Sequence, residues 1–154
     1  MVIRKASIKD FEALKEIKLL SKKEELKYSP TLKQIVKNKE NYFSYLKKDL
    51  SHNNRAVFIA LDNKKVVGMI LAQSFKPLPI SKFQKKGYIS NLYVLNGYRK
   101  KGIGKKLVNY VLRWLKKKNV SHITLEIHVD NKPALKLYHK LGFKDYTIKL
   151  AKEI

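Results

Sequence analysis

One short stretch of this 154-residue chain combines glycines with a dense group of basic side chains. It runs from Arg99 to Gly104 with the sequence RKKGIG, and two further lysines follow it directly. Apolar residues recur with a helical period from Gly102 onward, so the stretch is expected to be the turn that leads into a helix. Glycines let the backbone approach a ligand closely, and free N–H groups at a helix N-terminus bind phosphate. These residue types predict a binding site for a pyrophosphate group.

Two better-known phosphate-binding motifs do not fit this stretch. Gly97 and Gly102 have the spacing of the P-loop glycines, but Ile103 stands where that motif requires Lys. Gly102 and Gly104 could begin a dinucleotide fingerprint, but Leu107 occupies the position of its third glycine. A glycine-containing turn alone is a weak signal, because such turns often merely join a strand to a helix.

Candidates for proton transfer lie further along the chain. Residues 122–129 alternate strictly between apolar and polar, which places Thr124, Glu126 and His128 on one face of an expected strand. A central strand covered on both sides should not carry such a polar stripe unless the stripe faces a cleft. The stripe therefore indicates a cleft, with a solvated Glu126 as the alternative, and His128 is either an assisting base or inert. Tyr138 lies on an apolar helical stripe, and periodicity alone favours a core tyrosine there.

The elements that must position these residues predict a mixed α/β fold. The last helix is expected to be capped by Asp130 or Asn131 and to stop at Gly142. The expected strands cover residues 2–6, 55–61, 65–75, 87–95, 122–129 and 143–150, and the expected helices cover 7–20, 31–50, 102–118 and 131–141. This order, β-α-α-β-β-β-α-β-α-β, implies a sheet covered by helices.

Local signals set several of these boundaries. Ser7 with Asp10, and Thr31 with Gln34, have the spacing of capping boxes at helix starts. Residues 62–64, Asp-Asn-Lys, form a hairpin turn signal between two apolar runs. Residues 76–86 contain two prolines and four lysines and are expected to be a loop.

Composition limits the class of protein. The length and the 44% apolar content suit one globular domain over residues 1–154. The absence of Cys excludes disulfides, thiolate metal sites and a cysteine nucleophile, and the four histidines have no paired ligand spacing, so no metal is expected. The N-terminus lacks an apolar signal segment and no run is long enough to cross a membrane, so we expect a soluble cytoplasmic protein.

The net charge of +23 predicts attraction to anionic partners. Thirty-one of the 35 basic residues are Lys, whereas base readout favours Arg, so contact with nucleic acid is expected to be non-specific at most. Nucleotide bias in the genome is an equal explanation for much of the excess. Between positions 99 and 118, however, nine of twenty residues are basic and none is acidic. A local anion site is therefore expected there.

The order of these motifs resembles that of the GNAT superfamily of N-acetyltransferases, which transfer acetyl from acetyl-CoA to an amine. The resemblance is close from Gly87 to Phe143 and rests on the strand residues LYV, the turn YRKKGIGKKL, the segment LEI, and Asn131, Ala134, LY at 137–138 and LGF at 141–143. It implies a mixed, mostly antiparallel sheet flanked by helices on both faces. It also implies that the strand before the turn splays from the next strand at a bulge.

The resemblance further implies roles for the residues named above. Acetyl-CoA would lie with its pantetheine arm along the strand before the turn and its pyrophosphate on the turn amides. The implied contacts are Leu92, Tyr93, Val94, Arg99, Lys100, Lys101, Gly102, Ile103, Gly104, Lys105, Asn131 and Tyr138. In the family, Tyr138 matches the usual general acid, and Glu126 matches a carboxylate that serves as general base in the amino-terminal and ribosomal-protein branch.

One departure from the family concerns the acceptor. Amino-terminal acetyltransferases usually end with two strands that close over the peptide, whereas residues 144–154 suffice for one strand. The acceptor is therefore a small amine, an amino acid or a peptide. A homodimer is a further open expectation. Two other functions are kept as alternatives: a basic binding module for nucleic acid or ribosomes, and a CoA-binding regulatory domain.

Overall fold

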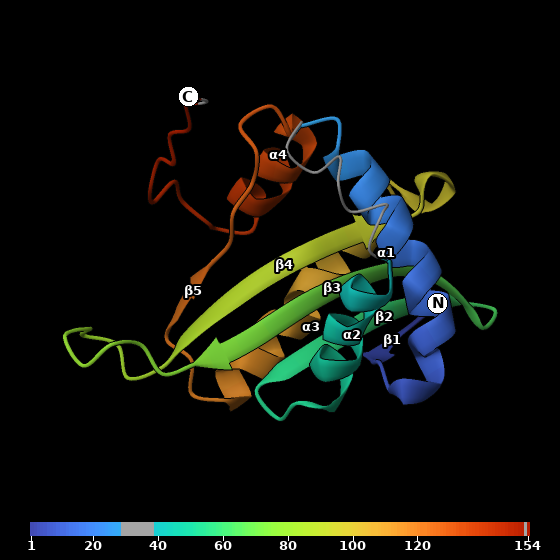
Figure 1. Cartoon of the computed structure of the whole chain (residues 1–154), viewed down its shortest axis with the longest axis horizontal. Coiled ribbons are helices and arrows are strands. Elements are labelled where there is room, and N and C mark those ends of the chain that lie inside the picture. The colour runs from blue at the N-terminus through green and yellow to red at the C-terminus, as the bar shows by residue number, and fades with distance from the viewer. Residues whose placement is uncertain (29–38, 153) are drawn as a thin grey trace.

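The computed structural model describes residues 1–28, 39–152 and 154 (Figure 1). Its elements follow the predicted order of strands and helices. They are β1 (Val2–Lys5), α1 (Phe11–Glu25), α2 (Lys39–Ser51), β2 (Arg55–Asp62), β3 (Lys65–Phe75), β4 (Lys86–Val94), α3 (Ile103–Lys117), β5 (His122–Thr124) and α4 (Lys132–Lys140). The mixed α/β architecture predicted from the sequence is confirmed.

The strands form a five-stranded sheet in the order β1-β2-β3-β4-β5. The first three pairings are antiparallel, and β4 pairs with β5 in parallel. The β2–β3 hairpin turns through Asn63 and Lys64, which have φ of 45° and 69°. Two successive left-handed residues are typical of the tight turns that match strand twist, so the predicted hairpin is confirmed.

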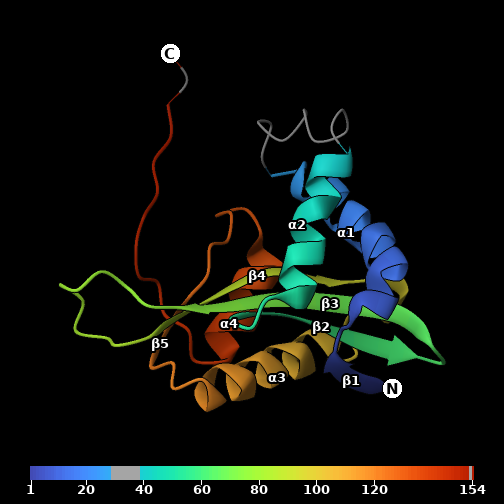
Figure 2. The same cartoon turned by 60° about the horizontal axis from the view of Figure 1, so that its bottom comes forward.

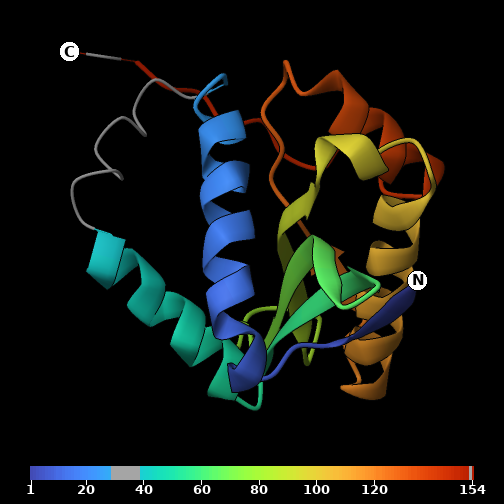
Figure 3. The same cartoon turned by 90° about the vertical axis from the view of Figure 1, so that its right-hand side faces the viewer.

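Helices cover both faces of the sheet (Figures 2 and 3). α1 and α2 lie on one face, over an apolar cluster that includes Leu14, Ile17, Leu46, Ile59 and Met69. α3 lies on the other face, over a second cluster that includes Ile70, Ile89, Leu107, Val111 and Tyr138. Because alternate residues of a strand point to opposite faces, each central strand contributes to both clusters.

Two irregularities open the sheet between β4 and β5. The register between β3 and β4 shifts between Met69 and Leu71, and Asn91 opposite the shift has a φ of 52°. The β4–β5 ladder contains three residue pairs and ends at Tyr88 with Thr124, although β4 continues to Val94. Beyond that pair the two chain segments diverge within the described residues. The bulge and the divergence implied by the resemblance are therefore present.

The end of the chain differs from the prediction. No residue between 143 and 152 is in a strand, and Ile148 and Leu150 are each 89% exposed. The expected strand over 122–129 is also shorter, because β5 ends at Thr124. Apolar and polar residues do alternate in both segments. A strand also needs a neighbouring strand to pair with, however, and the alternation does not show whether one is present.

The helix boundaries also shift. The first helix is longer than predicted, since a 3₁₀ turn over Ile8–Asp10 leads into α1, which runs to Glu25. The second capping box, Thr31 with Gln34, lies outside the described residues.

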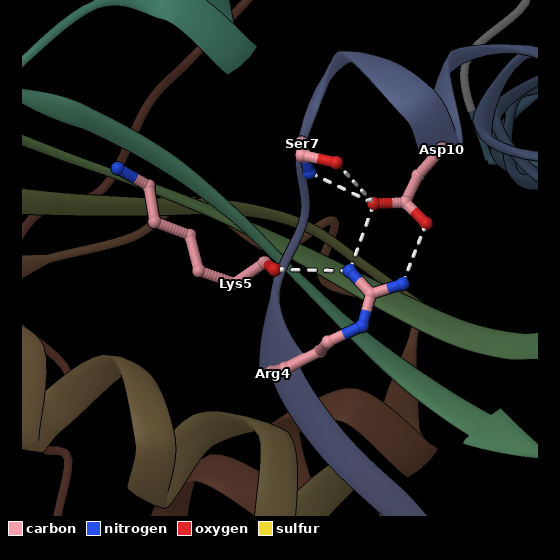
Figure 4. Close-up of polar contacts among 4 residues, drawn as sticks. All are labelled: Arg4, Lys5, Ser7 and Asp10. Carbon is pink, nitrogen blue, oxygen red and sulfur yellow. Dashed lines mark hydrogen bonds and ion pairs between the residues drawn. The ribbon is translucent and has the colours of Figure 1, made fainter.

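A clamp around Asp10 fixes the start of α1 against β1 (Figure 4). The Arg4 guanidinium donates to both carboxylate oxygens of Asp10, at 2.8 and 2.7 Å, and the Ser7 backbone N–H donates to Asp10 Oδ2 at 2.8 Å. The last of these is the bond expected of a capping box, so that prediction is confirmed. The Arg4 hydrogen bond lowers the pKa of Asp10 to about 2.

We predict that Asp10→Asn destabilises the protein in a pH-dependent way. The folded pKa lies below the ordinary 3.8, so the ionised clamp stabilises above about pH 4, and this stabilisation is lost as the pH falls toward 2. Denaturant unfolding at pH 7 should give a loss of about 1–2 kcal/mol, because the partly exposed Arg4 is screened by water. Glu12→Gln, a matched change on the exposed first turn, should have little effect. A loss that is equal at pH 7 and pH 2.5 would contradict this account.

Candidate active site

The predicted phosphate turn lies at the start of α3. Lys100 and Gly102 have left-handed backbones, with φ of 60° and 76°, and Gly102 is the N-cap of the helix. Turns of this kind bring successive N–H groups together into an anion-binding concavity. No side chain caps α3, so its first N–H groups have no side-chain partner among the described residues. Lys100, Lys101 and Lys105 are exposed around this turn.

α4 and β4 meet the start of α3. A Cβ built on Gly104 would lie 3.4 Å from Leu137 Cδ2 and 3.9 Å from Leu92 Cδ2. Three elements therefore converge beside the phosphate turn at Gly104, and Leu92 borders the opening between β4 and β5. Asn131, expected to contact the pantetheine arm, caps α4 by accepting a hydrogen bond from the Ala134 N–H at 3.3 Å. This cap confirms the predicted start of the last helix.

The Arg99 side chain is engaged away from the phosphate turn. Its Nε donates to the Val94 carbonyl at 2.8 Å, and its two terminal nitrogens donate to Glu24 of α1 at 2.9 and 2.5 Å. The guanidinium also lies over the Tyr93 ring, 5.3 Å from its centroid. Arg99 thus ties α1 to the end of β4, a role that the sequence did not indicate.

Tyr138 is 5% exposed and belongs to the core cluster under α3. Its ring packs edge-on against Phe143, with centroids 5.4 Å apart. Burial raises the pKa of its phenol. Leu92 and Ile127, on the two sides of the opening, pack against the same cluster. Tyr138 is therefore a core residue, as its periodicity indicated, in the cluster against which Leu92 and Ile127 pack.

Glu126 lies on the other side of the sheet. Its side chain is 72% exposed, and Lys149 Nζ is 3.9 Å from its Oε2. Ile123, Leu125 and Ile127 pack toward the α3 core, so Glu126 faces the α1/α2 side. His128 shares that side, where its ring stacks on Tyr28 with centroids 5.8 Å apart. Three apolar residues of the predicted alternation are thus confirmed, whereas Val129 is exposed.

Tyr88 is a residue that the sequence reasoning missed. It is half-buried at the last β4–β5 pair, where Thr124 is its neighbour. Burial, and then the charge of Glu126, raise the pKa of its phenol. The signal that could have identified it was its position three residues before Asn91 at the bulge of β4, on the face shared with Thr124 and Glu126.

A polar pocket of about 220 Å³ opens on the α1/α2 face beside Tyr88. Its walls come from α1, α2 and three strands. Its lining includes Lys18, Asp49, Arg55, Gln73, Tyr88 and Ser90. The structure therefore gathers the predicted residues in two groups: the phosphate turn with Leu92 and Tyr138 toward the α3 face, and Glu126 with the pocket toward the α1/α2 face.

The described residues contain neither a metal-binding cluster nor a membrane-spanning helix. In that part of the chain no group of three or more His, Asp or Glu side chains is arranged to hold a metal ion. No helix in it is long and apolar enough to span a membrane.

Comparison with known proteins gives matches in sequence and in structure. Residues 19–143 match the model of the acetyltransferase (GNAT) family. An N-alpha-acetyltransferase of Sulfurisphaera tokodaii is 34% identical over 117 residues, which cover 71% of this chain and 69% of the relative. N-alpha-acetyltransferase 30 of Homo sapiens is 32% identical over 77% of this chain, but the match covers only 33% of the human protein.

Solved structures agree with the sequence matches. A crystal structure of a predicted acetyltransferase with acetyl-CoA from Clostridium acetobutylicum superposes with a TM-score of 0.78. It is 25% identical in sequence, and the match covers 99% of this chain and 95% of that one. The chain therefore belongs to the GNAT family of acetyltransferases.

Proposed function

We propose that this N-acetyltransferase transfers the acetyl group of acetyl-CoA to the free amino terminus of a peptide or protein. The observation that carries the proposal is the opening between β4 and β5, which has an uncapped helix N-terminus on one side and a polar pocket on the other. One substrate can enter from each face, and the two can meet at the opening. The N-alpha-acetyltransferase names of its relatives support an α-amine as the acceptor.

Acetyl-CoA would bind on the α3 side. The N–H groups of Gly102, Ile103, Gly104 and Lys105 would hold the pyrophosphate, because they lie at the positive end of a 15-residue helix. Lys100 and Lys101, with the Lys105 ammonium, add positive charge around it. The β4 edge at residues 92–94 lacks a strand partner on its β5 side among the described residues, so its free polar groups would pair with the pantetheine amides. Arg99 would act as a positioning residue.

The acceptor amine must lose a proton before or as it attacks. Glu126 would take that proton, directly or through Tyr88 and water. The Tyr88 phenol is neutral at pH 7, and its raised pKa disfavours the phenolate further, so it can donate a hydrogen bond or pass a proton. Asn131 would contact the pantetheine arm while its side chain caps α4.

Transfer breaks one bond and forms another. The amine nitrogen bonds to the acetyl carbon, the carbon–sulfur bond breaks, and the electron pair of that bond leaves on sulfur. Tyr138 would donate its phenolic proton to the sulfur, and its raised pKa means that it keeps the proton until negative charge develops there. The proton taken by Glu126 balances the reaction, and exchange with solvent restores both residues.

We predict that Tyr138→Phe lowers kcat by about 10²–10⁴-fold, the usual range for loss of a general acid. The phenylalanine keeps the edge-on contact with Phe143, so thermal stability and the Kd for acetyl-CoA should change little. Release of the CoA thiol measures kcat, and calorimetry measures binding. Undiminished kcat in this variant would remove Tyr138 from the mechanism.

We predict that Glu126→Gln lowers kcat/KM by about tenfold or more at pH 7, and that part of the loss is recovered at higher pH, where the amine deprotonates in solution. Asp130→Asn is the matched control, because it removes one charge from the same exposed segment. It should leave kcat/KM near the native value. Equal losses in the two variants would indicate a general charge effect and not a base.

The proposed function itself is tested by incubating the protein with acetyl-CoA and peptides that have a free or a blocked amino terminus. Mass spectrometry should find one acetyl group, on the α-amine of the free peptides only. Acetylation of lysine side chains alone, or CoA binding without any transfer, would contradict the proposal.

A further inference from the structure

A row of polar side chains crosses the sheet on its α1/α2 face and begins at Tyr88. The backbone register pairs Tyr88 with Gln73 on β3, and Gln73 with Arg55 on β2. Paired residues share a face and neighbouring strands lie about 4.8 Å apart, so the Cα atoms of Tyr88 and Arg55 are about 10 Å apart. All three residues line the same pocket. The pocket thus leads from the proposed reacting centre to Arg55.

The far end of this pocket is charged. Arg55 Nη1 donates to Asp49 Oδ1 of α2 at 2.9 Å, and within the described residues its other guanidinium N–H groups make no hydrogen bond. The Arg55 side chain is 40% exposed. Lys18 brings a second cation from α1 and is only 5% exposed. Arg55 and Lys18 are the basic residues among those that line the pocket, and Asp49 is the acidic one.

A carboxylate is the group that suits this pocket. A guanidinium presents parallel N–H donors that match the two oxygens of a carboxylate, and such charge-assisted bonds are among the strongest in proteins. Asp49 already accepts from Arg55, so a second carboxylate would bind the donors that Asp49 does not use. Ser90 and Asn91 on the pocket wall supply neutral hydrogen-bonding groups.

We infer that this pocket binds a carboxylate of the acceptor, so that the enzyme prefers acceptors with an acidic group that can reach Arg55 while the amine lies at the reacting centre. The inference rests on the proposed acetyl transfer and specifies the acceptor of that same site. The carboxylate can come from an acidic side chain near the amino terminus of a peptide, or from the terminal carboxylate of a very short peptide.

The net charge of +23 attracts every acidic acceptor, so the test must separate the pocket from the whole surface. Arg113 offers a matched control, because it lies exposed on α3, on the opposite face of the sheet from Arg55. Arg55→Gln and Arg113→Gln remove the same charge from the protein. Working at roughly 0.3 M salt suppresses the long-range contribution further.

The readout is the ratio of kcat/KM values for two amidated tetrapeptides, Ser-Glu-Ala-Ala and Ser-Gln-Ala-Ala. The native enzyme should prefer the glutamate peptide at least tenfold, Arg55→Gln should remove most of that preference, and Arg113→Gln should keep it. Asp49→Asn removes the competing negative charge beside Arg55 and should raise the ratio. Poor folding of Arg55→Gln could lower the ratio by itself, but it could not produce the increase expected for Asp49→Asn. The two opposite shifts together therefore assign the preference to the pocket.

Failure of the carboxylate pocket and failure of the proposed acetyl transfer give different results in this experiment. If both peptides are acetylated at equal rates, or if both arginine variants shift the ratio alike, the carboxylate pocket is wrong while acetyl transfer stands. If neither peptide is acetylated, the proposed function fails. A third outcome is that the native enzyme prefers the free dipeptide Ser-Ala over its amide but shows no preference between the tetrapeptides. If Arg55→Gln abolishes this dipeptide preference, the pocket is supported, and the carboxylate it binds is the terminal carboxylate of the acceptor.

Discussion

The divergence of β4 and β5 is the constraint on which the rest of the structure depends. A parallel ladder of three pairs holds the strands together up to Tyr88 and Thr124, and the bulge at Asn91 turns β4 away beyond them. Without this opening, the N-terminus of α3 and the α1/α2 pocket would be separated by a continuous sheet. With it, a thioester held on one face can meet an amine held on the other, so that position and orientation supply much of the catalysis.

The two faces carry different chemistry because different elements cover them. On the α3 side, backbone N–H groups and exposed lysines suit a pyrophosphate, and Tyr138 is held rigidly in the core. On the α1/α2 side, the walls carry ionised and neutral polar side chains, as expected where an acceptor must be recognised. Arg99 connects the α1/α2 side to the sheet, because its hydrogen bonds to Glu24 and to the Val94 carbonyl fix α1 relative to the end of β4.

Much of this arrangement could be predicted from the sequence, because periodicity and capping are local properties. The helix after Gly102, the Asn131 cap and the hairpin at residues 62–64 were all predicted in this way. The missing last strand and the short β5 show the limit, since pairing depends on neighbours that a pattern does not reveal. Tyr88 and the Arg55 pocket were not predicted for the same reason. Arg55, Gln73 and Tyr88 are far apart in the chain and are brought together only by the strand register. The Arg99–Glu24 pair likewise joins distant segments.

The central claim is that acetyl-CoA binds at the N-terminus of α3, and a calorimetric titration tests it most directly. A Cβ at Gly104 meets its neighbours at ordinary contact distances, so Gly104→Ala should fold and bind acetyl-CoA much as the native protein does. Gly104→Asp adds a negative charge to the first turn of α3, close to where the pyrophosphate is expected, and at roughly 0.3 M salt it should weaken binding by at least about 100-fold. Equal binding by the two variants, or no binding by the native protein, would contradict the account.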